Sequence, residues 1–456
     1  MIFTQYYLEC LSQASYLIGD ESTGRAVVVD PRRDINEYVQ DAEAAGLTIE
    51  LILETHFHAD FLSGHLELAN ATGAIIGLSD VASPEFDVRP FADGEKYSLG
   101  DIELEILQTP GHTPESISIV VREQPGREPW GVLTGDTLFI GDVGRPDLLA
   151  SIGFERDELA DMLYDSLHNK LMPLPDATRV YPAHGAGSAC GKNLSTETSS
   201  TMGQQRAENY ALLAPDKQTF IDMVTEGQPP VPGYFAYDAI LNRKDRKLLD
   251  ENSSIDALSL ARAEALVAGG AMLVDGRGPD EFGNGHLAGS VNVGLDGRYA
   301  EFAGSVVPGD VDIVLLVDEG RELEARNRLA RIGFDRVVGY LESPHQVMID
   351  NPEKVQQASR LTASELAERF ESIDDLQLID IRNPGEFALG AIDGAAAMPV
   401  GQMPGRLSEI DPAKSTVVYC AGGYRSSVAA SYLRNHGFED VSDLLGGYGA
   451  WVQTLA

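Results

Sequence analysis

The stretch LILETHFHADF (residues 51–61) decides how the first half of this chain is interpreted. It begins with an apolar run of the kind that forms a buried strand, and His56, His58 and Asp60 follow at alternate positions. Loops at strand ends are where an α/β scaffold presents functional side chains. The stretch therefore predicts a strand that delivers metal-binding or catalytic groups at its end.

Three further strand-like runs end at polar clusters. Gly111-His112-Thr113 follows one run, Gly135-Asp136-Thr137 ends another, and Pro182-Ala183-His184 ends a third. A single histidine after a strand is usually a hydrogen-bonded structural residue. Four strand-end clusters in one domain are hard to produce that way, so we predict a metal site.

Apolar runs with the composition of buried strands recur through this first region. These runs are residues 26–30, 49–55, 74–78, 102–110, 117–121, 131–136 and 179–184. Helical stretches lie between the runs, and alternation of this kind predicts a mixed α/β fold.

The second half of the chain contains a repeat. Residues 271–293 are echoed by 376–400, and residues 329–342 are echoed by 433–447. The copies lie about a hundred residues apart, so we predict two copies of one α/β domain.

Domain boundaries follow from the length and from local composition. A chain of 456 residues is too long for one hydrophobic core, because cores stop growing near about 250–300 residues. Prolines followed by charges at 228–254 indicate a linker, and Thr362 with Glu365 predicts a capping box where the two copies join. The predicted domains are residues 1–250, 255–345 and 358–456.

Composition limits the partners. The net charge of −37, from 71 acidic and 34 basic residues, repels phosphate backbones, so nucleic acid is not expected as a partner. No apolar run approaches the roughly 18–20 residues of a membrane span, and no secretory signal is readable at the amino terminus. The three cysteines lie far apart and are expected to be free thiols, which indicates a cytoplasmic protein.

A second reactive site is predicted near the carboxyl terminus. The strand 415–420 runs into the loop Cys420-Ala421-Gly422-Gly423-Tyr424-Arg425-Ser426-Ser427 and then into an alanine-rich helix. A cysteine between a buried strand and a helix amino terminus lies where backbone N–H groups and the helix dipole stabilise an anion. Arg425 adds a cation, so we predict that Cys420 reacts as a thiolate.

The four polar clusters of the first half resemble the motifs of the metallo-β-lactamase superfamily, over about residues 1–245. The resemblance implies an αββα sandwich with a metal site between two β-sheets. Phe61 stands where the dinuclear hydrolases of this superfamily carry a histidine for the second metal, and a phenyl ring cannot bind a metal. That leaves His56, His112 and Asp136, two imidazoles and one carboxylate, which suit one non-haem Fe(II) per chain. His58, Asp60 and His184 would then orient the ligands or bound water.

Within the superfamily, the phrases THFHADFLSGH (55–65), TPGHTPES (109–116) and YPAHGAGSACGK (181–192) resemble the persulfide dioxygenases. This implies oxidation of the terminal sulfur of a low-molecular-weight thiol persulfide to sulfite with O₂. Arg145 matches an arginine near the thiol carrier, although a structural pairing with a neighbouring carboxylate is an equal alternative. Cys190 could handle persulfide near the iron or could be an inert packing residue.

The carboxyl-terminal loop resembles the active-site loop of rhodaneses, over about residues 358–456. This implies thiosulfate sulfurtransfer through a Cys420 persulfide, with Arg425 as a catalytic residue. The substrate-binding residues implied by the same loop are Ala421, Gly422, Gly423 and Tyr424. Ala391 departs from the family, which often has histidine there, and the middle copy carries Val317 or its neighbour at the nucleophile position. We therefore expect the middle copy to be a degenerate rhodanese that carries no persulfide and packs or positions the flanking domains.

These expectations combine into one hypothesis: a multidomain α/β and α+β chain, with a metallo-β-lactamase sandwich followed by two rhodanese-like α/β domains. Its small-molecule partners would be a thiol persulfide, O₂, and thiosulfate or sulfite, and a homo-oligomer is expected. One alternative is a glyoxalase II-like thioester hydrolase with two metals. Another is a sulfur-carrier or sensor scaffold in which the rhodanese copies act as docking modules.

Overall fold

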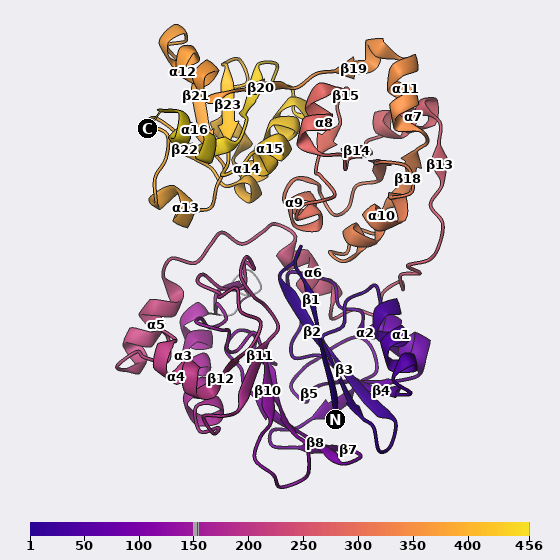
Figure 1. Cartoon of the computed structure of the whole chain (residues 1–456), viewed down its shortest axis with the longest axis vertical. Helices are drawn as coiled ribbons and strands as arrows, with labels where there is room; N and C mark the ends of the chain where they lie inside the picture. The colour runs from indigo at the N-terminus through magenta and orange to yellow at the C-terminus, as the bar shows by residue number, and fades with distance from the viewer. Residues whose placement is uncertain (149–152, 154, 456) are drawn as a thin grey trace. The chain divides into compact units, whose positions relative to one another are not determined.

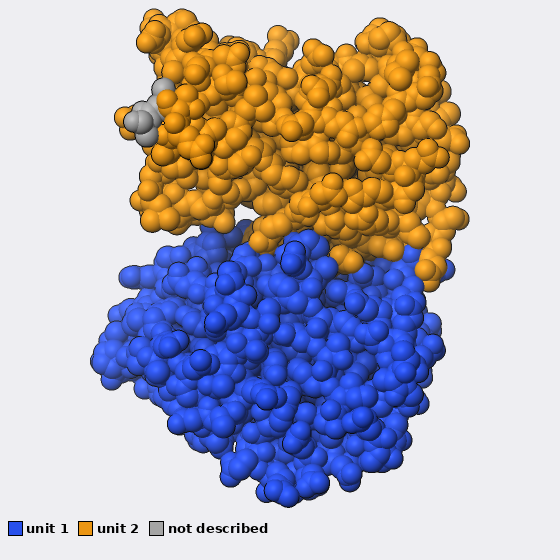
Figure 2. Space-filling model, in the orientation of Figure 1, with its two compact units in different colours: residues 1–231, 235–251 blue, residues 232–234, 252–456 orange. Residues whose placement is uncertain are grey.

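The computed structural model describes residues 1–148, 153 and 155–455, which form two compact units (Figure 1; Figure 2). The first unit comprises Met1–Val231 and Phe235–Glu251, and the second comprises Pro232–Tyr234 and the residues from Asn252 onward. Within the described part of the chain, no helix is both long enough and apolar enough to cross a membrane.

The first unit contains two six-stranded sheets. The first sheet has the order β1 (Ile2–Leu8), β2 (Gln13–Asp20), β3 (Arg25–Val29), β4 (Thr48–Leu53), β5 (Ile75–Ser79) and β6 (Arg89–Phe91). The second has the order β12 (Ser200–Thr201), β11 (Arg179–Pro182), β10 (Gly131–Gly135), β9 (Ile117–Arg122), β8 (Ile102–Gln108) and β7 (Lys96–Leu99). Strands predicted from apolar runs, such as 117–121 and 131–136, are confirmed.

Alternating side chains of these strands build the layers. Leu51 and Leu53 of β4 share one buried core with Ile119 of β9, so this core joins the two sheets. Ile52, between the two leucines, belongs instead to a core with Tyr38 on the outer side of the first sheet. Because successive residues of a strand face opposite sides, a sheet covered on both faces needs nearly continuous apolar runs.

The described part of the first unit also contains helices. They are α1 (Asn36–Ala44), α2 (His65–Thr72), α3 (Arg156–Ser166), the π-helical turn η2 (Leu167–Leu171), α4 (Met202–Glu208), α5 (Lys217–Thr225) and α6 (Phe235–Leu241). Helices α1 and α2 contact the first sheet, whereas Leu163 of α3 and Phe220 of α5 share a core with Val132 of the second sheet. The predicted αββα sandwich is confirmed.

The second unit contains two five-stranded parallel sheets with the same connectivity. One has the order β13 (Ala257–Leu258), β18 (Val337–Leu341), β17 (Ile313–Leu316), β14 (Met272–Asp275) and β16 (Val291–Asn292). The other has the order β20 (Ser359–Leu361), β24 (Val441–Leu444), β23 (Thr416–Tyr419), β21 (Gln377–Asp380) and β22 (Ala396–Ala397). A separate two-stranded antiparallel sheet is formed by β15 (His286–Leu287) and β19 (Val355–Gln356).

Short helices connect the strands of both copies. In the middle copy they are α7 (Leu260–Ala268), α8 (Pro279–Asn284), α9 (Tyr299–Val306), α10 (Glu322–Ala330), α11 (Pro344–Asp350) and η3 (Pro352–Lys354). In the last copy they are α12 (Ala363–Ser372), α13 (Pro384–Ala388), η4 (Val400–Gln402), α14 (Met403–Arg406), η5 (Leu407–Glu409), α15 (Tyr424–Asn435) and α16 (Gly447–Leu455). The predicted capping box of Thr362 and Glu365 at the start of α12 is confirmed.

The repeated Asp-x-Arg signature has the same structural role in both copies. Arg277 donates two hydrogen bonds to the buried Asp275 carboxylate, at 3.0 and 2.6 Å, and Arg382 pairs with Asp380 in the same way. Each guanidinium also donates to a backbone carbonyl eight residues further along the chain. A buried charge needs such a partner, which explains why both residues recur at this spacing.

We expect His286 of the middle copy to make the stability of the second unit depend on pH. Its ring is buried, stacks on Phe282 at 3.8 Å between centroids, and lies 2.9 Å from the Phe282 carbonyl oxygen through Nδ1. Burial lowers its pKa to about 4, below the roughly 6.5 of an unfolded chain. The stabilisation by the neutral ring is therefore complete above about pH 6.5 and declines as the pH falls toward 4.

We expect the free energy of unfolding of the second unit to fall by up to about 3 kcal/mol through this window. The His286→Gln variant cannot titrate, and denaturant unfolding at several pH values should show a flatter dependence for it. An equally steep decline in the variant would refute this assignment.

Candidate functional site

Four loops at strand ends bring the predicted metal-site residues into one buried region of the first unit. His56 follows β4, His112 lies between β8 and β9, Asp136 follows β10, and His184 follows β11. All four side chains are buried.

His56, His112 and Asp136 form a compact group. One ligand atom from each lies within 4.8 Å of the others. The Asp136 Oδ2 atom is 3.4 Å from His112 Nε2 and 3.8 Å from His56 Nε2. This oxygen is buried and has no hydrogen-bond partner among the described residues. The structure therefore brings the three predicted ligands together around an unpaired carboxylate oxygen.

The outer nitrogens of both rings face acceptors that determine the tautomer. His112 Nδ1 lies 3.0 Å from the carbonyl oxygen of Arg145, which can only accept, so Nδ1 donates. His56 Nδ1 lies 3.0 Å from Thr55 Oγ1, and the Thr55 hydroxyl donates to Asp30 Oδ2 at 2.8 Å, so it accepts from His56. Both Nε2 atoms consequently carry lone pairs that are directed toward Asp136.

Charge in this group is favourable for a cation. Burial lowers the pKa of His56 and of His112, so both rings are neutral at physiological pH. Burial would raise the pKa of Asp136, but the charge of His184 and its hydrogen bond to Asp136 hold that pKa well below its ordinary range. The group combines two neutral nitrogen lone pairs with one negatively charged carboxylate in a buried space. Such a set of donors favours the binding of a metal cation.

Asp60, His184 and Cys190 form a second group beside the first. His184 lies 2.7 Å from Asp136 Oδ1 through Nδ1 and 2.7 Å from Asp60 Oδ2 through Nε2. Burial alone would lower the pKa of His184, but Asp136 and Asp60 raise it well above its usual value. Burial, with Asp60 and Asp136, raises the pKa of Cys190, whose thiol stays protonated. Cys190 therefore lies beside the metal group, and its handling of persulfide stays a prediction.

His58 belongs to a third group. Its Nε2 lies 3.2 Å from Asp30 Oδ1 and 3.6 Å from Glu54 Oε2, in a fully buried position. Burial and the Asp30 carboxylate raise the pKa of Glu54 well above its usual value, which indicates a protonated acid. The ring of Phe61 lies against His58, with 4.3 Å between centroids. Asp30 and Glu54 were not among the predicted site residues, although Asp30 ends a predicted strand.

Thr55 is expected to control metal affinity, because its hydroxyl links His56 to Asp30. Replacing Thr55 with valine keeps the side-chain shape but removes this link, and loss of an outer partner of a metal ligand typically costs about 10–100-fold in affinity. Thr55→Ser retains the hydroxyl and is the matched control. Competition with a chelator measures the affinity; equal affinity in both variants would exclude this role.

Arg145 is largely occupied by structural contacts. Its guanidinium donates to both carboxylate oxygens of Asp147, at 2.7 and 2.8 Å, and to the carbonyl oxygens of Ala189 and Pro229. The side chain is only 2% exposed. This is the structural pairing weighed against the carrier-binding role, and that role stays a prediction.

The Cys420 loop has the predicted strand–loop–helix arrangement. Cys420 follows β23, and the N–H of Gly423 donates to its sulfur at 3.0 Å. Gly423 has a φ of 108°, which a residue with a side chain rarely adopts, and it precedes α15. The sulfur also lies 3.6 Å from the Ser426 hydroxyl. The thiol is buried, whereas Ala421 and Gly422 are exposed.

Arg425 has a partner that the sequence did not reveal. Its guanidinium forms two hydrogen bonds of 2.7 Å with the carboxylate of Glu386 in α13. Burial would lower the pKa of Arg425, but Glu386, Cys420 and Glu301 together raise it. In the middle copy, the buried side chain after β17 is Val317, so that position carries no thiol.

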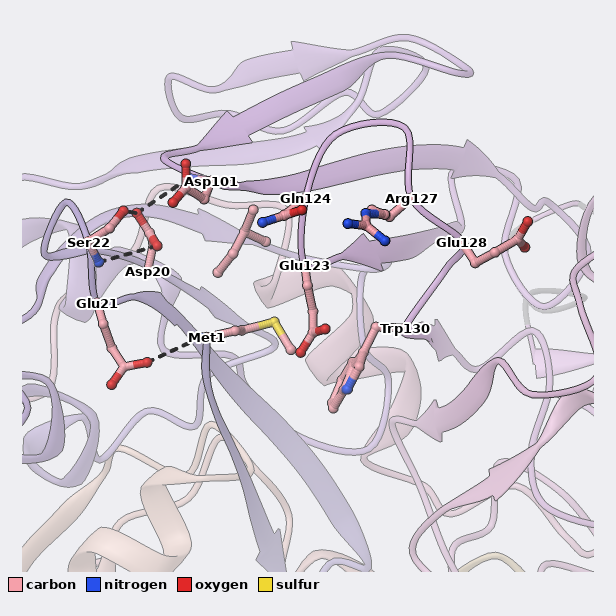
Figure 3. A pocket seen from close by; sticks show the side chains of 11 residues that line it. Met1, Asp20, Glu21, Ser22, Asp101, Glu123, Gln124, Arg127, Glu128 and Trp130 are labelled. Atoms are coloured by element: carbon pink, nitrogen blue, oxygen red, sulfur yellow. Dashed lines mark hydrogen bonds and ion pairs between the residues drawn. The ribbon is translucent and has the colours of Figure 1, made fainter.

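A separate pocket of about 690 Å³ lies elsewhere in the first unit (Figure 3). Its lining includes the acidic residues Asp20, Asp101, Glu123 and Glu128, together with Trp130. None of the predicted site residues lines it.

Two family models match the chain. The metallo-beta-lactamase superfamily model matches residues 8–184, and the rhodanese-like domain model matches residues 259–343 and 362–454. These ranges place the metal group in the first domain and Cys420 in the last.

Curated relatives match the first domain. The cytoplasmic hydroxyacylglutathione hydrolase of Arabidopsis thaliana is 34% identical over 191 residues, which are 39% of this chain and 66% of the relative. The mitochondrial persulfide dioxygenase ETHE1 of Homo sapiens is 30% identical over 174 residues, which are 37% of this chain and 63% of the relative. The chain thus spans about two thirds of the length of these relatives.

A solved structure extends the similarity over a larger part of the chain. A metallo-beta-lactamase from Staphylococcus aureus is 34% identical, with a TM-score of 0.66, and the match covers 74% of this chain and 98% of that one. Both the fold and the sequence therefore agree with the family models. The chain belongs to the metallo-beta-lactamase superfamily, and two rhodanese-like domains follow its metallo-beta-lactamase domain.

Proposed function

We propose that the chain is a non-haem iron(II) persulfide dioxygenase joined to a thiosulfate sulfurtransferase. The observation that carries the first activity is the buried group of His56, His112 and Asp136, with Phe61 where a further histidine would be needed for a second metal. We also propose the division into domains 1–250, 255–345 and 358–456. The relative named persulfide dioxygenase supports the general kind of enzyme.

The donor set fits iron(II). Two neutral imidazoles and one carboxylate are the ligand set of non-haem iron oxygenases, and they leave coordination positions open. The unpaired Oδ2 of Asp136 and the two Nε2 lone pairs are the atoms that would hold the metal. When bound, the iron would supply the open positions and the redox chemistry that a reaction with O₂ requires.

The remaining side chains prepare this site. Thr55 and the Arg145 carbonyl orient the two imidazoles, and His184 holds Asp136 through the other carboxylate oxygen. Burial of all these groups excludes bulk water, which strengthens electrostatic interactions in the site. The Cys190 thiol lies beside the metal ligands, in a group with Asp60 and His184.

Sulfur transfer would use the Cys420 loop. The Cys420 thiolate attacks the outer sulfur of thiosulfate, the sulfur–sulfur bond of thiosulfate breaks, and sulfite leaves with the electron pair of that bond. A thiolate acceptor then attacks the outer sulfur of the Cys420 persulfide, which releases a small-molecule persulfide and restores the Cys420 thiolate. The Gly423 N–H at 3.0 Å and the start of α15 stabilise the anionic sulfur.

A thioester hydrolase is the second candidate. The relative named hydroxyacylglutathione hydrolase favours it, and so does the group of Asp60, His184 and Cys190, which offers three ligand atoms for a second metal. Phe61 argues against it, because it removes one nitrogen ligand of a dinuclear site.

Oxygen uptake and thioester hydrolysis distinguish the two candidates. The iron-loaded full chain should consume O₂ with persulfides of small thiols and release sulfite in equal amount. Hydrolysis of a glutathione thioester should be negligible. Rapid thioester hydrolysis without oxygen uptake from any persulfide would overturn the proposal.

A further inference from the structure

Tyr424, the first residue of α15, is held by the middle copy. Its hydroxyl donates to the carbonyl oxygen of Gly294 at 2.6 Å, and its ring lies 5.7 Å from that of Phe302. Glycines form the seat of the ring: a Cβ at Gly294 would lie 3.0 Å from Tyr424 Cε2, and one at Gly297 would lie 2.5 Å from Cζ. The seat therefore admits the ring only because these two residues lack side chains.

Asn292 of β16 holds the next turn of the same helix. Its Oδ1 accepts from the Ser427 hydroxyl at 2.7 Å, and its backbone N–H donates to the Ser431 hydroxyl at 2.8 Å. Its Nδ2 donates to two carbonyl oxygens of the middle copy, those of Asp275 and Arg277. All of these polar side chains are buried, and an unpaired buried polar group is costly, so the contacts define one position of α15 against β16.

These contacts act on the reactive loop because they lie at the end of α15 that faces the thiol. Gly423, next to Tyr424, donates its N–H to the Cys420 sulfur, and Arg425, on the other side of Tyr424, binds Glu386. A displacement of Tyr424 would therefore shift both the amide and the cation near the sulfur.

We infer that the middle copy, which carries Val317 in place of a nucleophile, is a positioning part of the Cys420 site. Tyr424 and Asn292 are the positioning residues through which it fixes the amino terminus of α15. The inference rests on the proposed sulfur transfer through Cys420. It makes the sequence-based expectation, a copy that packs or positions the flanking domains, specific to two residues and one loop.

The Gly297→Ala variant of the full chain tests this inference. The added methyl group must displace the Tyr424 ring, and small misplacements of reacting groups can cost on the order of 10²-fold in rate. We expect about a tenfold fall in kcat/KM for sulfurtransfer. We also expect slower alkylation of Cys420 by iodoacetamide, followed on the Cys420 peptide by mass spectrometry. The matched control is Gly278→Ala, because a Cβ there meets nothing within 4 Å.

A double-mutant cycle distinguishes positioning through Tyr424 from general damage to the fold. In a Tyr424→Ala background the ring is absent, so Gly297→Ala should cause no further loss. Tyr424→Phe retains the ring and removes the hydroxyl that binds the Gly294 carbonyl, so its Cys420 should react at a rate between those of wild type and Tyr424→Ala. If Gly297→Ala does not fold, the alkylation rate of Cys420 in Tyr424→Phe tests the inference by itself.

Two results would overturn the inference. One is alkylation of Cys420 in Gly297→Ala and in Tyr424→Phe at the wild-type rate. The other is a full Gly297→Ala penalty in the Tyr424→Ala background. The alkylation rate does not depend on turnover, so it tests the positioning inference even if the chain has no sulfurtransferase activity. Absence of sulfurtransfer in the wild-type chain would contradict the proposed function alone.

Discussion

The His112→Ala variant is expected to lose its iron and, with it, oxygen uptake from persulfides. The substitution removes one of two nitrogen ligands and leaves only His56 and Asp136 in the group. Removal of an outer partner alone can weaken metal binding by about 10–100-fold, and loss of a direct ligand should exceed that. Iron analysis after anaerobic reconstitution, followed by an oxygen electrode, measures both effects.

His168→Ala is the matched control for His112→Ala. His168 lies in η2 of the same unit, stacks on Tyr164 and does not belong to the metal group. The control should retain wild-type iron content and oxygen uptake. Full iron content and uptake in His112→Ala would show that His112 is not a ligand.

The Cys420→Ser variant is expected to eliminate thiosulfate sulfurtransfer. A serine hydroxyl is far less acidic than a thiol and cannot carry a sulfane sulfur. Oxygen uptake with a supplied small-molecule persulfide should continue, because the metal group and Cys420 lie in separate units. His56→Ala should have the reverse effect, so the two assays together separate the two activities.

Cys10→Ser is the matched control for the sulfurtransfer assay, because Cys10 is a cysteine that belongs to neither the metal group nor the Cys420 loop. It should keep both activities. Loss of oxygen uptake in Cys420→Ser at saturating persulfide would mean that the two sites are obligately coupled. Retained sulfurtransfer would mean that Cys420 is not the nucleophile.

The fold could be predicted because its signals are local. The apolar run at 49–55 overlaps β4, which ends at Leu53, and the polar residues after the strand begin the metal loop. The echo between 271–293 and 376–400 corresponds to two sheets of identical strand order. Hydrophobic periodicity and the repeat can both be recognised in the sequence, and each corresponds to strands or sheets in the structure.

The partners of the site residues could not be predicted in the same way. The Nε2 atom of His58 faces Asp30 and Glu54, although the His58 ring lies only 4.1 Å from the ring of His56 between centroids. Glu386 lies 39 residues from Arg425, and Gly294 lies 130 residues from Tyr424. Such pairs form only when the chain has folded, and the spacing of residues in the sequence does not predict them.

The metal content of the anaerobically purified full chain tests the central claim most directly. Elemental analysis of this protein as purified, with oxygen uptake measured on the same sample, counts the metal and relates it to activity. The account predicts one iron per chain, bound by His56, His112 and Asp136, and uptake proportional to iron. Two zinc ions per chain at full occupancy, with thioester hydrolysis as the main activity, would contradict it.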